Sequence, residues 1–267
     1  MGLALFFLAA LLWGLQGATP AHADPGTLYV DGATGSDTTD CTNPAAPCET
    51  IGYALTQAVN GDEIRVAEET YTETLDIGIT VTLKGGYEAT GWTRDIAAHP
   101  TIVDANGADS PVICIYPDAD VTVESFTVEG GNHTSGNGGG FWVISATVSI
   151  SDTVIRENSA NEGGGVFIEG DSNVSLINST ITSNTVSAAY GTSGFSGGTR
   201  GHVLIQNTVF AENTGDCVLN FESGQPFEIT GGQVVSNTVS GFRTIGLSGS
   251  GTISGTAVLS NTSAAIA

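Results

Sequence analysis

Basic residues are scarce in this sequence. Its 267 residues include only 6 Lys and Arg against 28 Asp and Glu, the formal net charge is −22, and Lys84 is the single lysine. Binding to nucleic acid or to anionic lipid requires clustered Lys and Arg, so the composition argues against both as partners. An acidic polysaccharide would also be repelled unless a divalent cation bridged the charges.

Long hydrophobic runs are also missing, with one exception near the start. An apolar run from Leu3 to Leu15 precedes the small-residue motif Ala21-His22-Ala23. This pattern predicts a cleaved secretory signal peptide over residues 1–23, although no Lys or Arg stands before the run. A transmembrane anchor would need ~20 apolar residues, and no later stretch is long enough. We therefore expect an exported protein, extracellular or at the cell surface, with no membrane span after signal cleavage.

Cysteine is limited to four residues. Cys41 and Cys48 lie seven positions apart in a loop rich in Pro and Asn, and in an exported protein this spacing predicts a short loop closed by a disulfide. A metal site is the alternative, but no His stands nearby. Cys114 and Cys217 sit among apolar residues and are expected to be buried thiols, because a catalytic thiolate would need a basic neighbour.

The second half of the chain contains a repeat. An apolar residue stands three places before an Asn that Ser or Thr follows, and these Asn positions recur at steps of 26, 29, 24 and 24 residues. The pairs are Ile155-Asn158, Ile181-Asn184, Phe210-Asn213, Val234-Asn237 and Val258-Asn261. An apolar pair two residues apart, such as Val148/Ile150, aligns upstream of the first four Asn, whereas Gly251 replaces the first member before Asn261, and the frame extends back to about Val121. A self-similar period of this length indicates a solenoid.

The composition of the units favours β-coils over helical ones. Apolar residues alternate with polar ones at period two, and Val, Ile and Thr are enriched. Stacked units would then pair strand on strand ~4.8 Å apart in parallel sheets. The recurrent Asn predicts a structural ladder, because Asn tolerates left-handed turns and its amide can bond to the same amide one coil along. A row of ligand contacts is the alternative.

An amphipathic helix is predicted ahead of the solenoid. Thr50 suits the N-cap position, and Asn60-Gly61 suits the end of the helix. The apolar face between them consists of Ile51, Ala54, Leu55, Ala58 and Val59. Such a helix would cover the open first coil. The predicted organisation is a cap over residues 24–63, which holds the Cys loop and the helix, and a solenoid over residues 64–267 with regular repeats from about residue 121.

The last unit, in contrast, ends at residues 263–267 with no charged or helical cap. An uncovered parallel edge invites pairing with another chain. One hypothesis is that the chain is a fragment or a truncated gene product. The other is that it is a subunit whose last coil is covered by something else.

These residues resemble a known group of proteins. The opening segment from Tyr29-Val30 through Gly61-Asp62 to Tyr71, and the later Gly85-Gly86-Tyr87, are similar to right-handed parallel β-helix proteins of the pectin-lyase-like superfamily, above all secreted or surface-displayed repeat proteins. Gly163-Gly164-Gly165-Val166 and Phe210-Ala211-Glu212-Asn213 resemble the GGxx and FxxN repeats of chlamydial-type polymorphic outer membrane proteins. The resemblance implies an all-β, right-handed parallel β-helix solenoid with an N-terminal capping helix.

The same superfamily contains enzymes. The resemblance implies, for its lyases, an acid cluster that holds Ca²⁺ beside a Lys or Arg base, and for its glycoside hydrolases several Asp with Gly-His-Gly and Arg-x-Lys motifs. Those motifs are missing here, and Gly201-His202-Val203 matches the Gly-His-Gly motif only in part. Asp152 and Arg156 in one coil are the best candidates for catalysis. The alternative for Arg156 is a surface ion pair of little energy.

Other candidate site residues are carboxylates and aromatics. Asp118 and Asp120 are expected on one strand face, and Glu169-Gly170-Asp171 in a turn, so both could supply oxygen ligands to a structural Ca²⁺. No other cofactor is expected. Trp142 and Tyr190 stand near Gly-rich turns and could stack on a sugar, whereas filling of the core is the alternative.

We therefore expect an exported, non-catalytic β-helix module for extracellular or cell-surface binding or structure. Its partner would be a polysaccharide or a surface protein, and glycans suit the exposed aromatic residues. The alternative function is a Ca²⁺-dependent polysaccharide lyase or glycoside hydrolase.

Overall fold

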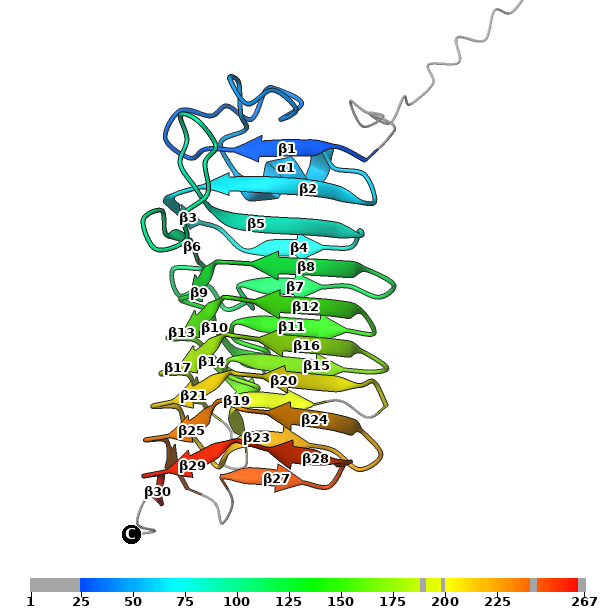
Figure 1. Ribbon diagram of the computed structural model, residues 1–267, viewed down its shortest axis with the longest axis vertical. Coiled ribbons are helices and arrows are strands. Elements are labelled where there is room, and N and C mark those ends of the chain that lie inside the picture. The colour runs from blue at the N-terminus through cyan, green and yellow to red at the C-terminus, as the bar shows by residue number, and fades with distance from the viewer. Residues whose placement is uncertain (1–24, 188–190, 198–199, 241–243, 264–267) are drawn as a thin grey trace, which may run out of the picture.

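The chain forms a stack of β-coils around one long axis (Figure 1). This computed structural model describes residues 25–187, 191–197, 200–240 and 244–263. The signal peptide predicted over residues 1–23 lies outside these ranges. Each regular coil passes through four sheets, and every strand pairing in these sheets is parallel.

The nine-stranded sheet consists of β1 (Thr27–Val30), β2 (Asp62–Ala67), β5 (Val81–Tyr87), β8 (Asp120–Glu124), β12 (Thr147–Ser151), β16 (Asn173–Ile177), β20 (Val203–Gln206), β24 (Pro226–Thr230) and β28 (Ser250–Ser254). The eight-stranded sheet consists of β3 (Glu69–Thr72), β6 (Thr101–Asp104), β9 (Thr127–Glu129), β13 (Val154–Arg156), β17 (Thr180–Thr182), β21 (Val209–Ala211), β25 (Gln233–Val235) and β29 (Ala257–Leu259).

The seven-stranded sheet consists of β4 (Leu75–Ile77), β7 (Ile113–Ile115), β11 (Phe141–Ile144), β15 (Val166–Glu169), β19 (Thr192–Gly197), β23 (Cys217–Phe221) and β27 (Ile245–Leu247). The six-stranded sheet consists of β10 (Asn132–Asn137), β14 (Ser159–Glu162), β18 (Thr185–Val186), β22 (Thr214–Gly215), β26 (Thr238–Val239) and β30 (Thr262–Ser263). The predicted all-β, right-handed parallel β-helix is confirmed.

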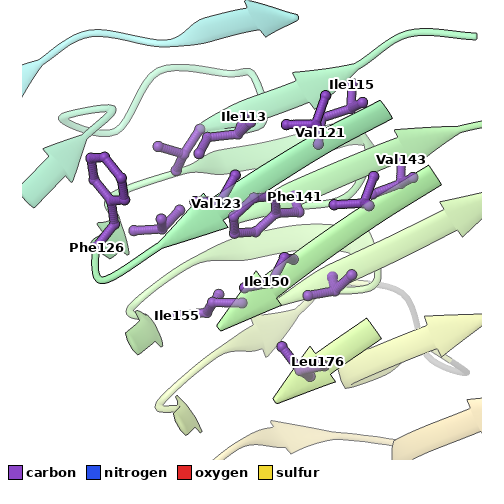
Figure 2. Close-up of a cluster of buried hydrophobic side chains, with 14 of the residues drawn as sticks. Ile113, Ile115, Val121, Val123, Phe126, Phe141, Val143, Ile150, Ile155 and Leu176 are labelled. Atoms are coloured by element: carbon purple, nitrogen blue, oxygen red, sulfur yellow. The ribbon is translucent and has the colours of Figure 1, made fainter. Parts of the chain in front are cut away.

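Alternate residues of each strand point into the interior of the stack. Val123, Ile150, Leu176 and Ile205 occupy the same position in four consecutive strands of the nine-stranded sheet, and all four are buried. Figure 2 shows the first three inside the coil, where side chains from the facing sheets meet them. Full burial of one aliphatic side chain stabilises by about 1.5–3 kcal/mol. The predicted period-two pattern therefore supplies the core.

The capping helix α1 (Ile51–Gln57) begins where the sequence predicts. The Thr50 side chain accepts a hydrogen bond from the Tyr53 N–H at 3.1 Å. The Glu73 carboxylate accepts the N–H groups of Ile51 and Gly52 at 2.9 and 2.8 Å, which satisfies two donors that the first turn leaves open. Burial raises the pKa of Glu73 against the opposing effect of these bonds.

The helix ends earlier than predicted. Ala58 is already extended, and the Val59 N–H donates to the Asp62 carboxylate at 2.6 Å. Asn60 and Gly61 lie in the turn that follows, and β2 begins at Asp62. The nine-stranded sheet also begins inside the segment assigned to the cap, because β1 pairs with β2 from Thr27 onward.

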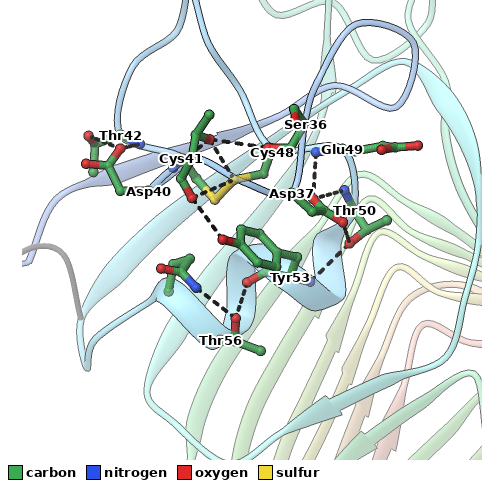
Figure 3. The surroundings of a disulfide bond; sticks show 12 residues. Ser36, Asp37, Asp40, Cys41, Thr42, Cys48, Glu49, Thr50, Tyr53 and Thr56 are labelled. Carbon is green, nitrogen blue, oxygen red and sulfur yellow. Dashed lines mark hydrogen bonds between the residues drawn. A yellow bond between two sulfur atoms is a disulfide. The ribbon is translucent and has the colours of Figure 1, made fainter. Parts of the chain in front are cut away.

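The predicted disulfide between Cys41 and Cys48 is confirmed. Both cysteines are fully buried. The Tyr29 N–H donates to the Cys41 carbonyl at 2.8 Å, and the Cys48 N–H donates to the Tyr29 carbonyl at 2.9 Å, so the loop covers the outer edge of β1. In Figure 3 the Tyr53 ring of α1 lies beside the disulfide and its hydroxyl donates to the Thr39 carbonyl at 3.2 Å.

Ion pairs tie the first coils together. Glu63 on β2 accepts hydrogen bonds from Arg65 at 2.7 Å and from Lys84 on β5 at 2.6 Å. Arg94 reaches Glu124 on β8 at 2.7 Å. Burial alone would raise the pKa of Glu63, but the hydrogen bonds from Lys84 and Arg65 outweigh it and hold the pKa below its ordinary value.

Aromatic rings pack around these ion pairs. The Tyr29 and Trp92 rings meet edge to face with centroids 4.8 Å apart, and the Arg65 guanidinium lies 5.5 Å from the centre of the Tyr87 ring. The Trp92 indole N–H donates to the Pro44 carbonyl at 3.1 Å. The loop between β5 and β6 is therefore joined to the Cys loop.

The recurrent asparagines form a buried ladder. From Asn158 to Asn237, each side-chain amide donates to the carboxamide oxygen of the next Asn along the axis at 2.9 to 3.1 Å. The same oxygen accepts the backbone N–H of the preceding Asn, and each amide also donates to a carbonyl of an earlier coil. The ladder residues are Asn158, Asn184, Asn213, Asn237 and Asn261.

The expectation that these asparagines adopt the left-handed turn is wrong by one residue. Positive φ lies at the residue before each Asn, which is Glu157, Ser183, Glu212, Ser236 and Ser260. This turn aims the following side chain inward, where its amide has no water and must bond to protein. Ladder formation therefore follows from the burial of the Asn and not from its own φ.

Replacing a ladder residue should destabilise the stack. In Asn158→Ala the Gly131 N–H, the Val128 carbonyl and the Asn184 carboxamide each lose a buried partner, so the free energy of unfolding in urea should fall by about 2–4 kcal/mol. The control is Asn161→Ala, three residues along on β14 and exposed, which should change it by less than about 0.5 kcal/mol. Equal effects in both variants would contradict the role of the ladder.

Candidate functional site

The outer side of the seven-stranded sheet gathers aromatic and acidic side chains. The register places Asp76, Cys114, Trp142 and Phe167 next to one another on β4, β7, β11 and β15. Their strand neighbours Ile115, Val143 and Ile168 are buried. Because side chains alternate along a strand, the row of Asp76, Cys114, Trp142 and Phe167 lies on the outside.

A second outward row lies beside the first. Ile144 and Glu169 are register partners, and Tyr116 directly follows β7 with 42% of its surface exposed. We call the two rows together the Trp142 face, which comprises Asp76, Cys114, Tyr116, Trp142, Ile144, Phe167 and Glu169.

Hydrogen bonds hold the rings of this face in place. The Trp142 indole N–H donates to the Glu169 carboxylate at 3.0 Å, and the Tyr116 hydroxyl donates to Asp76 at 3.1 Å. The His133 ring lies 5.7 Å from the Trp142 ring, centroid to centroid. Its Nδ1 lies 2.8 Å from the Asn137 carbonyl, and since a carbonyl only accepts, Nδ1 carries a hydrogen.

The thiol and the phenol of this face are neutral at physiological pH. Burial raises the pKa of the Cys114 thiol to about 11, although its hydrogen bond with Tyr116 opposes the change. Interaction with Cys114, and then with Asp76, raises the pKa of Tyr116 to about 12. Formal charge on the Trp142 face therefore comes from its carboxylates.

The two candidate catalytic residues do not form a pair. Within the described chain Arg156 forms its ion pair with Glu129, its register partner one coil back, at 2.6 Å, and not with Asp152. Asp152 stands in the left-handed turn after β12 with φ 49°. It lines a shallow pocket of about 110 Å³ whose walls include Phe126 and Val154.

The expected pair of calcium ligands is also not formed as predicted. Asp118 lies in the turn before β8 with φ 66°, and Asp120 opens the strand itself, so the two carboxylates do not share a strand face. A left-handed turn residue breaks the period-two alternation on which that expectation depended. Among the described residues, no three His, Cys, Asp or Glu lie together as metal ligands would.

The structure also places most of the other residues that the sequence singled out. Trp142 faces outward while Phe141 is fully buried, and Glu169 is bonded to Trp142. Tyr190 lies outside the described residues. Cys114 is buried as expected, whereas Cys217 is only partly buried, and desolvation raises its pKa. No helix in the described ranges has the length and apolar character needed to cross a membrane.

Sequence reasoning missed Glu162 at the end of β14. The Ser196 hydroxyl donates to its carboxylate at 3.2 Å. Burial raises the pKa of Glu162, and the charge of Glu222 adds to the increase. These partners lie 34 and 60 positions further along the chain, so only the stacking of coils brings them together, and no local motif indicates it.

Comparison with known proteins agrees with this architecture. Residues 99–263 match the family described as "Right handed beta helix region". This match covers more than half of the chain, and the protein therefore belongs to that family of right-handed β-helices. Neither the curated proteins nor the solved structures contain a match.

The environment of Cys114 can be tested by its reactivity. A thiol with a pKa of about 11 is almost entirely protonated at pH 8, so in a Cys217→Ser variant Cys114 should react with a maleimide more than about a hundredfold more slowly than in the unfolded chain, where the pKa is ~8.5. The rate should rise about tenfold per pH unit up to pH 10. A rate equal to that in denaturant would contradict the buried position.

Proposed function

We propose that this protein is an exported, non-catalytic β-helix module that binds glycans in the extracellular space or at a cell surface through the Trp142 face. The observation that carries the proposal is the row of outward-facing aromatic rings on consecutive coils. Trp142 lies on β11, and Phe167 lies on the neighbouring strand β15. Tyr116 directly follows β7, which is the other neighbour of β11 in the seven-stranded sheet.

Aromatic rings and carboxylates together suit sugars. A ring provides a flat apolar surface with little conformational entropy to lose, and a carboxylate oxygen accepts hydrogen bonds from hydroxyl groups. Glu169 and Asp76 are already oriented by Trp142 and Tyr116, and each oxygen has further acceptor capacity.

The geometry and the charge narrow the ligand class. Neighbouring strands lie ~4.8 Å apart, about the length of one pyranose ring, so a linear polymer lying along the axis meets one side chain of the face per coil. The face carries carboxylates on a chain of net charge −22. It therefore favours neutral or amino sugars over acidic ones.

Family membership supports the structural part of this function. A parallel β-helix is a stiff rod whose coils contact only their neighbours, which suits display of a ligand at a distance from an attachment point. Membership of the pectin-lyase-like superfamily, and kinship with chlamydial-type surface repeats, are part of the same proposal. A surface protein is the second class of partner, and Ca²⁺ is the cation that would bridge to an acidic polysaccharide.

One observation favours the alternative, a Ca²⁺-dependent polysaccharide lyase or glycoside hydrolase. Glu162 is a carboxyl group whose pKa is raised by burial and by Glu222, and glycosidic cleavage uses one protonated and one ionised carboxyl. Against it, Arg156 is bound to Glu129 and is not free to act as a base.

Glycan binding should depend on Trp142. In titrations with soluble neutral and amino-sugar oligosaccharides followed by tryptophan fluorescence or calorimetry, Trp142→Ala should weaken binding at least about tenfold, which corresponds to the ~1.4 kcal/mol that stacking contributes. The matched control is Leu204→Ala, an outward-facing apolar residue of the nine-stranded sheet, which should bind as the wild type does. Binding that is unchanged in Trp142→Ala would contradict the proposed face.

Catalysis is tested separately. Incubation with polygalacturonate, alginate and neutral polysaccharides, with and without Ca²⁺, should give neither the absorbance of an unsaturated product nor new reducing ends. Turnover that is lost in Glu162→Gln, or in Arg156→Ala, would show that the alternative function is correct.

A further inference from the structure

A pocket of about 290 Å³ lies where the capping helix meets the first strand of the seven-stranded sheet. One wall comes from α1 and the other from the segment that leads into β4. The residues that line it are Gly52, Leu55, Thr56, Thr74 and Asp76. Its volume is close to that of the smallest ligand pockets, ~300 Å³, so it has room for one sugar ring and not for a whole chain.

This pocket is continuous with the Trp142 face. Asp76 belongs to both, because it lines the pocket and also begins the outward row that passes through Cys114 to Trp142. Thr74 directly precedes β4 and is exposed like Asp76. The pocket is therefore the end of the Trp142 face on the side of the capping helix.

The helix closes this end of the face. In the seven-stranded sheet β4 is the last strand, and α1 packs beside it at the first end of the stack (Figure 1). Helix side chains and outward side chains of the sheet line the same pocket, so α1 stands as a wall at the edge of the outer surface. A linear polymer that follows the face from β15 toward β4 meets this wall directly after Asp76, and its chain ends in the pocket.

The lining of the pocket suits a terminal sugar. Leu55 provides apolar surface for the C–H side of a ring, and Thr56 and Thr74 provide hydroxyl groups. Tyr116 donates to Oδ1 of Asp76 at 3.1 Å, and among the described residues no donor bonds to Oδ2. This oxygen can accept a hydrogen bond from a hydroxyl or an amino group. A terminal sugar has a free hydroxyl where an internal sugar has its glycosidic linkage, so Asp76 favours a chain end.

We propose that this pocket binds the terminal sugar of a neutral or amino-sugar chain whose following units lie over Tyr116, Trp142 and Phe167. The inference rests on the proposed function, and it adds that the protein recognises chain ends and not the middle of a polymer. The pocket and the strands β7, β11 and β15 follow one another at steps of ~4.8 Å, so affinity should rise with chain length up to about four sugar units and then stay constant.

Binding stoichiometry tests this inference on the wild-type protein. In calorimetric titrations with soluble linear glucose and N-acetylglucosamine chains of increasing length, the number of protein molecules bound per chain should stay the same, because the number of ends does not change. Internal binding would instead let more protein molecules bind as the chains lengthen. A stoichiometry that grows with chain length, together with weaker binding in Trp142→Ala, would refute end recognition and leave the proposed function standing.

Thr56→Trp tests the pocket by filling it. Thr56 is exposed on α1, so the larger ring has no need to enter the core, and binding of the same oligosaccharides should weaken at least about tenfold. The matched control is Thr72→Trp, an exposed threonine of β3 in the eight-stranded sheet, which should bind as the wild type does.

The outcomes separate the two proposals. Equal affinity in Thr56→Trp and the wild type, while Trp142→Ala binds more weakly, would show that the pocket takes no sugar although the face does. If no oligosaccharide binds to the wild type, the proposed function and end recognition are both wrong.

Discussion

The structure depends on one constraint: each residue of a regular coil lies directly beside its equivalent in the next coil. Parallel register fixes this relation from β8 to β28 in the nine-stranded sheet. In this sheet an apolar inward residue therefore meets another apolar residue in each coil from β8 to β24, which is favourable without further conditions. The inward asparagine of each later coil meets its own kind, which is tolerable only if the group can donate and accept at once. A carboxamide can do so, and a carboxylate at neutral pH cannot, which accounts for Asn at the buried turn.

The same register allows the outer residues to vary without changing the packing of the core. Outward side chains contact neighbours on their own face but not the core, so the Trp142 face can assemble rings from β7, β11 and β15 without altering the packing beneath. Cys114 is the exception, since Trp142 and Tyr116 lie beside it and it is 6% exposed. The Cys114 thiol is neutral because the neighbouring side chains bury it, and not because of any property of cysteine itself.

Features that recur in every repeat could be predicted from the sequence, and contacts that occur only once between two repeats could not. The Asn spacing and the period-two pattern indicate the coil, the core and the ladder because each recurs from unit to unit. The ion pair of Arg156 with Glu129 joins residues 27 positions apart, and it depends on which residue the register sets opposite. Glu162 and Ser196 are further apart still. The shared strand face expected for Asp118 and Asp120 was wrong for a local reason. Side chains alternate only within a strand, and Asp118 stands in a left-handed turn before β8.

The first coils solve the same stacking problem by other means, because they precede the ladder. Two of the six basic residues, Lys84 and Arg94, bridge coils there through Glu63 and Glu124, and Arg65 pairs with Glu63 within β2. Exposed pairs of this kind contribute at most about 1 kcal/mol each, and they titrate.

Since the folded-state pKa of Glu63 lies below its ordinary value of 4.5, its contribution to stability is present above that value and is lost as the pH falls through the lowered pKa. Glu73, with its raised pKa, changes in the opposite sense: its contribution is present below 4.5 and is lost as the pH rises through the raised pKa. Carboxamides do not titrate in this range, so coils joined by asparagine keep their contacts at any pH at which the backbone stays folded, whereas the ion pairs between the first coils depend on pH.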